Sequence, residues 1–310
     1  MFMKRNAPTG ILGFPVTPFD SQGNIDELAL SQNIQYLLDS GLEAIFVACG
    51  AGEFHSLENR EYESIIEVAT ATVKGKVPVY TGVGGNLSDA IYKAKISEKH
   101  GVDGYLIMPA YLINGEQEGI YQYVHSIATS TNLNAIVYQR DNVVMTLDTI
   151  ERLVEIPQIV GFKDGHGSME HIIEFTQSIG NKIGWLNGMP MAEVTMPAYI
   201  PLGFDSYSSA ISNYIPHISR KFYDALLEGD QTTVNEIYQD VILPINRIRR
   251  QGKGYAISLI KAGMEIVGLP INSKNVRPPV TPVKHEHYEQ LEEILKKALI
   301  KYPSNLTKSL

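Results

Sequence analysis

The feature that most constrains this chain is a regular alternation between short apolar runs and longer segments with helical periodicity. Eight runs rich in β-branched and aromatic residues predict strands, and their starts recur about every 20–35 residues. The predicted strands are Gly10–Pro15, Glu43–Ala48, Val77–Val83, Gly104–Pro109, Asn134–Gln139, Gln158–Lys163, Ile183–Asn187 and Phe204–Ala210. The predicted helices between them include Asp26–Ser40, Leu57–Val73, Asp89–His100, Gln117–Ser130 and Thr146–Val154. This pattern indicates either an open doubly wound sheet or a closed α/β barrel, and it does not choose between them.

The strand pattern stops after Pro216, and the rest of the chain has helical periodicity and propensity. The helices predicted there are His217–Glu228, Thr232–Arg249, Tyr255–Val267 and His285–Lys301. A proline-rich run at residues 277–282 predicts a stiff, extended connector before the last helix. Because no flexible linker is visible, we expect this helical part to form one structural unit with the rest.

Composition and charge narrow the class of protein. A net charge of −8 and a pI near 5.5 argue against a general affinity for nucleic acid or anionic membranes. They leave open an anionic small-molecule substrate, which needs only local positive groups. The single cysteine, Cys49, excludes an internal disulfide and fits a reducing compartment. The chain shows neither a signal-peptide pattern nor about 20 consecutive apolar residues, so we expect a cytoplasmic protein without a membrane span.

One predicted strand ends on a lysine, Lys163, which is followed at once by a loop rich in glycine and polar residues. In a barrel, the C-terminal ends of the strands form the active site. A lysine held there against apolar walls loses solvation, which lowers its pKa and frees the amine to act as a nucleophile. The alternative is a lysine that extends along the strand end to reach solvent.

The preceding predicted strand has the same construction and ends near Tyr138 and Arg140. Tyr138 would face the same end of the fold as Lys163, where a phenol can relay protons. Arg140 could hold a carboxylate through a two-pronged contact. The alternative is a packed strand tyrosine and a surface arginine.

A glycine-rich turn follows the second predicted strand, at Gly50, Ala51 and Gly52. Its backbone N–H groups could bind a carboxylate, although a tight turn that simply requires glycine is an equal alternative. Residues 81–86 lack the spacing of a dinucleotide fingerprint and the lysine of a P-loop. The histidines show no metal-ligand spacing on a shared helix face, so we predict neither a metal nor an organic cofactor.

Taken together, these motifs resemble the dihydrodipicolinate synthase/N-acetylneuraminate lyase family of Schiff-base aldolases and dehydratases over nearly the whole chain. The segments that carry the resemblance are Phe14–Phe19 with Gly23 and Asp26, Gly50–Glu53, Pro109–Tyr111, Tyr138, Gly161–Lys163 and Arg277–Pro279. The synthase branch usually has Tyr-Asn-x-Pro-x-Arg at the fifth strand and Lys-Glu-x-x-Gly at the sixth. Here residues 138–142, 161–167 and 207–210 are instead similar to a branch of decarboxylating dehydratases that act on keto-diacids.

The resemblance implies a (β/α)8 TIM barrel with a C-terminal helical extension. Residues 1–216 would form the catalytic barrel, and residues 217–310 the last barrel helix and the extension. It implies that Lys163 forms the Schiff base, that Tyr138 relays protons, and that the chain assembles into a homotetramer, a dimer of dimers. Tyr111 matches a tyrosine that reaches a neighbouring subunit's relay in synthase relatives. Ala51 departs from the family, because relatives commonly have a threonine there; a water or Ser209 could replace its hydroxyl.

The resulting prediction is a lyase for a six-carbon diacid with a ketone beside one carboxylate. Lys163 would condense with the ketone, and the iminium would allow loss of water and then of CO2 without a cofactor. The residues predicted to bind this substrate are Gly50, Ala51, Arg140, Asn187, Ser208 and Ser209. Three alternatives remain open at this point: a sibling aldolase that makes pyruvate, a dihydrodipicolinate synthase, and a non-catalytic barrel that binds sugar acids.

Overall fold

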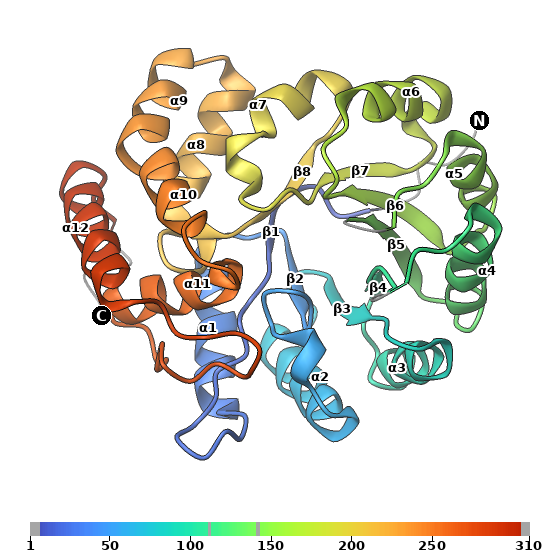
Figure 1. The fold of residues 1–310 in the computed structure, drawn as a ribbon, viewed down its shortest axis with the longest axis horizontal. Helices are drawn as coiled ribbons and strands as arrows, with labels where there is room; N and C mark the ends of the chain where they lie inside the picture. Colours follow the sequence, from blue (N-terminus) through green and yellow to red (C-terminus); the bar gives the residue numbers. More distant parts are fainter. Residues whose placement is uncertain (1–6, 111–112, 141–142, 305–310) are drawn as a thin grey trace.

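A computed structural model describes residues 7–110, 113–140 and 143–304. Eight parallel strands follow one another in chain order around a closed barrel, with helices outside it (Figure 1). The strands are β1 (Gly10–Gly13), β2 (Ala44–Val47), β3 (Val79–Val83), β4 (Gly104–Ile107), β5 (Asn134–Gln139), β6 (Ile159–Asp164), β7 (Gly184–Asn187) and β8 (Ser206–Ser209). Pairing of β1 with β8 closes the sheet, so the barrel is the correct one of the two architectures that the pattern allowed. All eight predicted strands are confirmed, and most are shorter than predicted at one end or both.

The helices that surround the barrel agree with the amphipathic segments, with two additions. They are α1 (Glu27–Asp39), α2 (Asn59–Val73), α3 (Leu87–Lys99), α4 (Gln117–Ala128), α5 (Leu147–Val154), α6 (Met169–Ile179), α7 (Met196–Tyr199) and α8 (Pro216–Glu228). The additions are α6 and the single-turn α7. Side chains or capping boxes at several N-termini bind backbone N–H groups of the first turn, as at Asp26, Asn86 and Thr146, and so define where these helices begin.

The C-terminal extension consists of α9 (Gln231–Ile237), α10 (Leu243–Arg249), α11 (Tyr255–Ile266) and α12 (His285–Lys301). The single helix predicted at Thr232–Arg249 is wrong in one respect: a π-helical turn, η6 (Tyr238–Ile242), separates α9 from α10. Pro244 explains the interruption, because it has no N–H to donate to the carbonyl of Asp240 and its ring crowds that turn.

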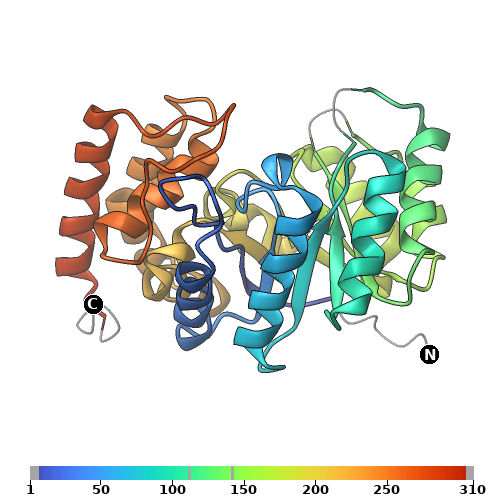
Figure 2. The ribbon, with the colours of Figure 1, turned by 90° about the horizontal axis from the view of Figure 1, so that it is seen from below.

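Two apolar clusters hold the structure together. One joins the barrel strands to the inner faces of α1–α6. The other joins the extension to residues just beyond the strand ends, such as Val16, Met191 and Ile211. The extension therefore lies beside the barrel and contacts its C-terminal end, and Figures 1 and 2 show α9–α12 together on one side.

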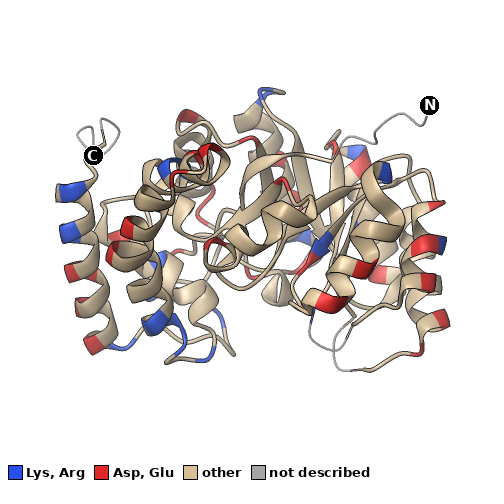
Figure 3. Ribbon diagram, turned by 90° about the horizontal axis from the view of Figure 1, so that it is seen from above, with Lys and Arg blue, Asp and Glu red and all other residues tan. Residues whose placement is uncertain are grey.

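Charged residues of both signs are interspersed on the outer helices, as Figure 3 shows along α12. Pairs four residues apart, such as Glu293 and Lys297 at 2.7 Å, account for part of this pattern. Among the described residues, no helix combines the length and the apolar character that crossing a bilayer requires.

Candidate active site

A cavity of about 380 Å³ lies at the C-terminal ends of the strands. It is lined by residues that follow or end β1, β2, β4, β5, β6, β7 and β8, and by side chains of the extension. Among the lining residues are Phe14, Gly50, Ala51, Tyr138, Arg140, Lys163, Ser208, Ser209 and Arg249. This is the position at which a (β/α)8 barrel carries its chemistry, because strands that run in parallel bring their ends together at one face.

Lys163 extends into this cavity from β6 and is only 4% exposed. Its Nζ lies 4.2 Å from the ring centre of Phe14 and 4.5 Å from that of Tyr138. No hydrogen bond or ion pair joins Lys163 to any residue that the structure describes. Burial lowers the pKa of the Lys163 amine from 10.5 to about 7, and the charge of Arg140 contributes in the same direction. A large fraction of the amine is therefore neutral, and nucleophilic, near neutral pH.

The backbone opposite Lys163 must be glycine. A Cβ built on Gly188, just after β7, would lie 2.6 Å from the Cγ and the Cε of Lys163. Gly165 makes similar room for Tyr138, whose hydroxyl oxygen would lie 3.0 Å from an added Cβ. These close approaches explain why the loops after β6 and β7 carry glycine next to the predicted catalytic pair.

The structure brings Tyr138 and Lys163 together, because they are register partners in β5 and β6. The Tyr138 hydroxyl donates a hydrogen bond to the carbonyl oxygen of Gly188 at 3.2 Å. The Arg140 guanidinium donates to the same hydroxyl oxygen at 3.4 Å. A phenol with a donor on one side and an acceptor on the other is oriented to exchange protons with a group bound at Lys163.

Gly50 and Ala51 line the cavity, as predicted from their turn. Glu53, at the end of this turn, holds it in place. Its side chain is fully buried, and its backbone has a left-handed φ of 58°. The Glu53 carboxylate accepts from Lys261 at 2.6 Å and from the backbone N–H of Arg277 at 2.9 Å. The conformation of this turn thus depends on the extension. Cys49 is buried beside it, and burial raises the pKa of its thiol to about 12, which fits an inert packing residue.

The residues predicted from β7 and β8 take different positions. Ser208 and Ser209 line the cavity, but the Ser209 hydroxyl donates to the Glu193 carboxyl at 2.6 Å. Asn187 is fully buried and is not among the lining residues. Its amide group donates to the Ala192 carbonyl at 3.2 Å and to the Thr195 hydroxyl at 3.0 Å. The amide of Asn187 therefore holds the loop after β7 and does not point at a substrate.

Two charged residues of the site were not predicted. Arg249, the last residue of α10, lines the cavity from the extension. Glu193 is buried behind Ser209, and burial raises the pKa of its carboxyl. A signal for Arg249 did exist: it lies one and four residues after the buried Ile248 and Ile245, next to the buried stripe of its helix. Tyr111 lies outside the described residues, as do Asp141 and Asn142 of the fifth-strand motif.

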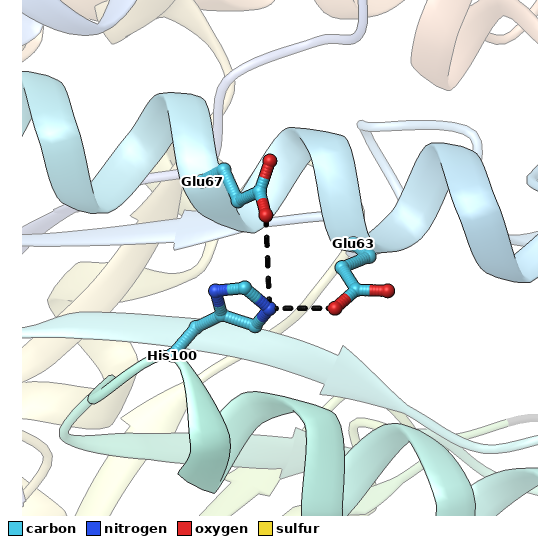
Figure 4. A group of neighbouring side chains, drawn as sticks. All are labelled: Glu63, Glu67 and His100. Atoms are coloured by element: carbon cyan, nitrogen blue, oxygen red, sulfur yellow. Dashed lines mark hydrogen bonds and ion pairs between the residues drawn. The ribbon is translucent and has the colours of Figure 1, made fainter.

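One group of possible metal ligands occurs among the described residues, away from this cavity. Glu63 and Glu67 of α2 lie near His100, the residue that caps α3 (Figure 4). His100 Nε2 lies 2.8 Å from the Glu63 carboxylate, which also accepts from Lys99 at 2.8 Å. These side chains form an ion-paired contact between two helices.

Lys163 has no counter-charge among the described residues, and its position at the end of the sixth barrel strand, beside a tyrosine, is the arrangement expected of lyases that form a Schiff base with a keto acid. The sequence profile of the dihydrodipicolinate synthetase family matches residues 7–298. The chain belongs to this family.

Its relatives differ in how similar they are. A protein from Oceanobacillus iheyensis named probable 5-dehydro-4-deoxyglucarate dehydratase is 94% identical over 99% of this chain and 100% of its own length. One of the same name from Bacillus subtilis is 63% identical over 96% of this chain and 97% of its own length. Among solved structures, dihydrodipicolinate synthase from O. iheyensis matches with a TM-score of 0.87 at 26% identity, covering 94% of this chain and 96% of that one.

Proposed function

We propose that this enzyme converts 5-dehydro-4-deoxy-D-glucarate to 2,5-dioxopentanoate, CO2 and water, a decarboxylating dehydration in glucarate and galactarate catabolism. The observation that carries the proposal is Lys163, a buried amine with no counter-charge among the described residues, in a cavity that Arg140 and Arg249 also line. The choice of substrate is supported by the names of the relatives that are 94% and 63% identical to this chain.

The first step is formation of the Schiff base. The neutral amine of Lys163 attacks the ketone carbon to give a carbinolamine, and loss of its hydroxyl as water leaves an iminium. Tyr138 carries the protons, because its hydroxyl lies in the same cavity and contacts both Gly188 and Arg140. No metal or organic cofactor is needed, since the iminium is the electron sink.

Dehydration and decarboxylation follow on the same adduct. Removal of a proton from the CH2 beside the iminium gives an enamine, which expels the neighbouring hydroxyl as water and leaves a conjugated iminium. The bond to the distal carboxylate then breaks, CO2 leaves, and the electron pair flows into the iminium. Protonation, tautomerisation of the enol to an aldehyde, and hydrolysis by one water return free Lys163 and 2,5-dioxopentanoate. The net change is loss of one CO2 and one water.

Substrate binding divides between two ends of the cavity. The carboxylate beside the ketone binds the backbone N–H groups at Gly50 and Ala51, and the part of the substrate that leads from the ketone toward the distal end binds near Arg140 and Ser208. The Ser209 hydroxyl donates a hydrogen bond to the Glu193 carboxyl at the edge of the cavity, and the Asn187 amide positions the loop after β7. The hydroxyl that Ala51 lacks is replaced by water or by Ser209.

A substrate panel tests this function. Purified enzyme is incubated with 5-dehydro-4-deoxyglucarate and with other 2-keto-3-deoxy acids, and CO2, pyruvate and 2,5-dioxopentanoate are measured together. We expect CO2 and 2,5-dioxopentanoate in equal amounts, a borohydride-trapped adduct at Lys163, and no activity in Lys163→Ala. Release of pyruvate would instead identify an aldolase, and failure to trap any adduct would identify a binding protein.

We also propose a homotetramer in the cytoplasm, supported by the family resemblance and by the single cysteine. In each subunit, residues 1–216 and 217–310 would act as one unit, since one apolar cluster includes side chains from both. Light scattering and a single cooperative unfolding transition are the measurements that test these two points.

A further inference from the structure

Two guanidinium groups line the cavity from different parts of the fold. Arg140 follows β5 of the barrel, and Arg249 ends α10 of the extension. They are close enough for the charge of Arg140 to act on Arg249, whose pKa is lowered first by burial and then by this neighbour. Both remain protonated at any physiological pH. Two like charges near each other in a partly buried cavity favour a bound anion.

The environment of Arg249 leaves its charge uncompensated. No hydrogen bond or ion pair joins its guanidinium to a residue in the part of the chain that the structure describes. The charge of Glu193 acts on Arg249, but no hydrogen bond or ion pair joins these two side chains, and burial raises the pKa of the Glu193 carboxyl. One Glu193 oxygen already accepts the Ser209 hydroxyl at 2.6 Å. Glu193 therefore makes no direct polar contact with Arg249, whose side chain lines the cavity in which a ligand would bind.

The two arginines differ in what they touch. The Arg140 guanidinium lies 3.4 Å from the Tyr138 hydroxyl, which places it beside the reacting atoms. Arg249 has no such contact and comes from a helix outside the barrel. A keto-diacid has one carboxylate beside the ketone and a second at its far end, so it can reach both the barrel and the extension. A keto acid whose single carboxylate lies beside the ketone has no anionic group that could reach Arg249.

We propose that Arg249 is the residue that selects dianionic 2-keto acids, by binding the carboxylate remote from the ketone. This inference rests on the proposed function, and it assigns to the extension a role in specificity. A diacid gains a charge-assisted contact with Arg249 that a monoanion cannot make, so the difference in binding favours the diacid.

The test compares two probes that both form a Schiff base. Pyruvate carries one carboxylate, and 2-oxoadipate carries two and has six carbons. Each is titrated against the enzyme with borohydride, and the adduct at Lys163 is measured by mass spectrometry. In Arg249→Gln we expect the half-saturating concentration of 2-oxoadipate to rise about 10- to 100-fold, the usual effect of a lost charge-assisted contact. That of pyruvate should change less than about threefold.

Matched variants complete the experiment. Arg247→Gln alters an exposed arginine on the same helix and should leave both titrations unchanged. Arg249→Lys should recover part of the affinity for 2-oxoadipate. Equal losses for both probes in Arg249→Gln would show a structural role and overturn the proposal, as would no change, or a wild-type enzyme that traps only pyruvate. If the selectivity changes as expected while 5-dehydro-4-deoxyglucarate is not turned over, the proposed function fails and the role of Arg249 stands.

Discussion

Two lysines lie buried in different regions of this molecule, and we assign them different roles. Lys163 is 4% exposed at the barrel mouth, and Lys261 of α11 is 0% exposed where the extension meets the barrel. Each Nζ lies over a phenylalanine ring, Phe14 in one case and Phe19 in the other. Lys261, however, contacts the Glu53 carboxylate at 2.6 Å and the Asn275 carbonyl at 2.8 Å. No such partner for Lys163 exists among the residues the structure describes.

The comparison shows that burial alone does not make a nucleophile. Burial lowers the pKa of both amines, but for Lys261 the charge of Glu53 and its hydrogen bond at 2.6 Å oppose the fall. A paired ammonium has no lone pair to offer and instead joins two parts of the fold. Lys163 has no such counter-charge among the described residues, so part of its population is the free amine. The lysine that we propose as the nucleophile is thus the one without a carboxylate partner in the described part of the chain.

The largest expected effect is a loss of stability when Lys261, the lysine paired with Glu53, is replaced. Lys261→Met leaves the Glu53 carboxylate buried with only neutral donors, so the free energy of unfolding should fall by about 3–5 kcal/mol. Urea denaturation measures this, with Lys274→Met, an exposed lysine of the same region, as the control. Adding Glu53→Gln should restore part of the loss. A Lys261→Met protein as stable as the control would show that the pair contributes nothing.

Replacing Lys163 should instead raise the free energy of unfolding at neutral pH. In the folded state the Lys163 amine binds its proton only below a pKa of about 7, against 10.5 in the unfolded chain. Holding it in the cavity therefore costs stability below pH 7, and the cost shrinks as the pH rises from 7 to 10.5. Lys163→Met should raise the free energy of unfolding at pH 7 by about 2–4 kcal/mol and lose that advantage near pH 10. A less stable variant at pH 7 would contradict this account.

The smallest effect concerns the pH profile. Because only the neutral amine attacks the ketone, kcat/KM should fall below an apparent pKa near 7. Arg140 helps to lower the pKa of Lys163, so Arg140→Gln should move this acidic limb to higher pH, in addition to weakening substrate binding. Steady-state rates from pH 5 to 9 measure the shift, with Arg247→Gln as control. A limb that stays in place or moves to lower pH would exclude this electrostatic coupling.

Much of the barrel side of the site could be predicted from the sequence. Lys163 and Tyr138 each end an apolar run, and parallel strands bring such ends together whatever the loops do. The loops were harder. Asn187 also ends a predicted strand, yet its amide donates hydrogen bonds to the carbonyl of Ala192 and to the hydroxyl of Thr195. Strand position predicts which end of the barrel a residue occupies, but not where a side chain turns once a loop folds over it.

What the sequence by itself determined is the periodicity: eight strands, most of their helices, and the strand-end residues that face the cavity. These follow from the local order of residues, in which continuous apolar runs predict strands and an apolar period of 3.6 residues predicts helices. The periodic pattern left closure of the sheet open, and the barrel that the family resemblance implied is confirmed by the pairing of β1 with β8. Only the tertiary structure decided the pairing of Glu53 with Lys261 and the arrival of Arg249 at the cavity. Each of these joins residues far apart in the chain, and such contacts depend on how whole elements pack. For this reason the sequence alone does not show that Lys163 has no carboxylate partner among the described residues while Lys261 has one.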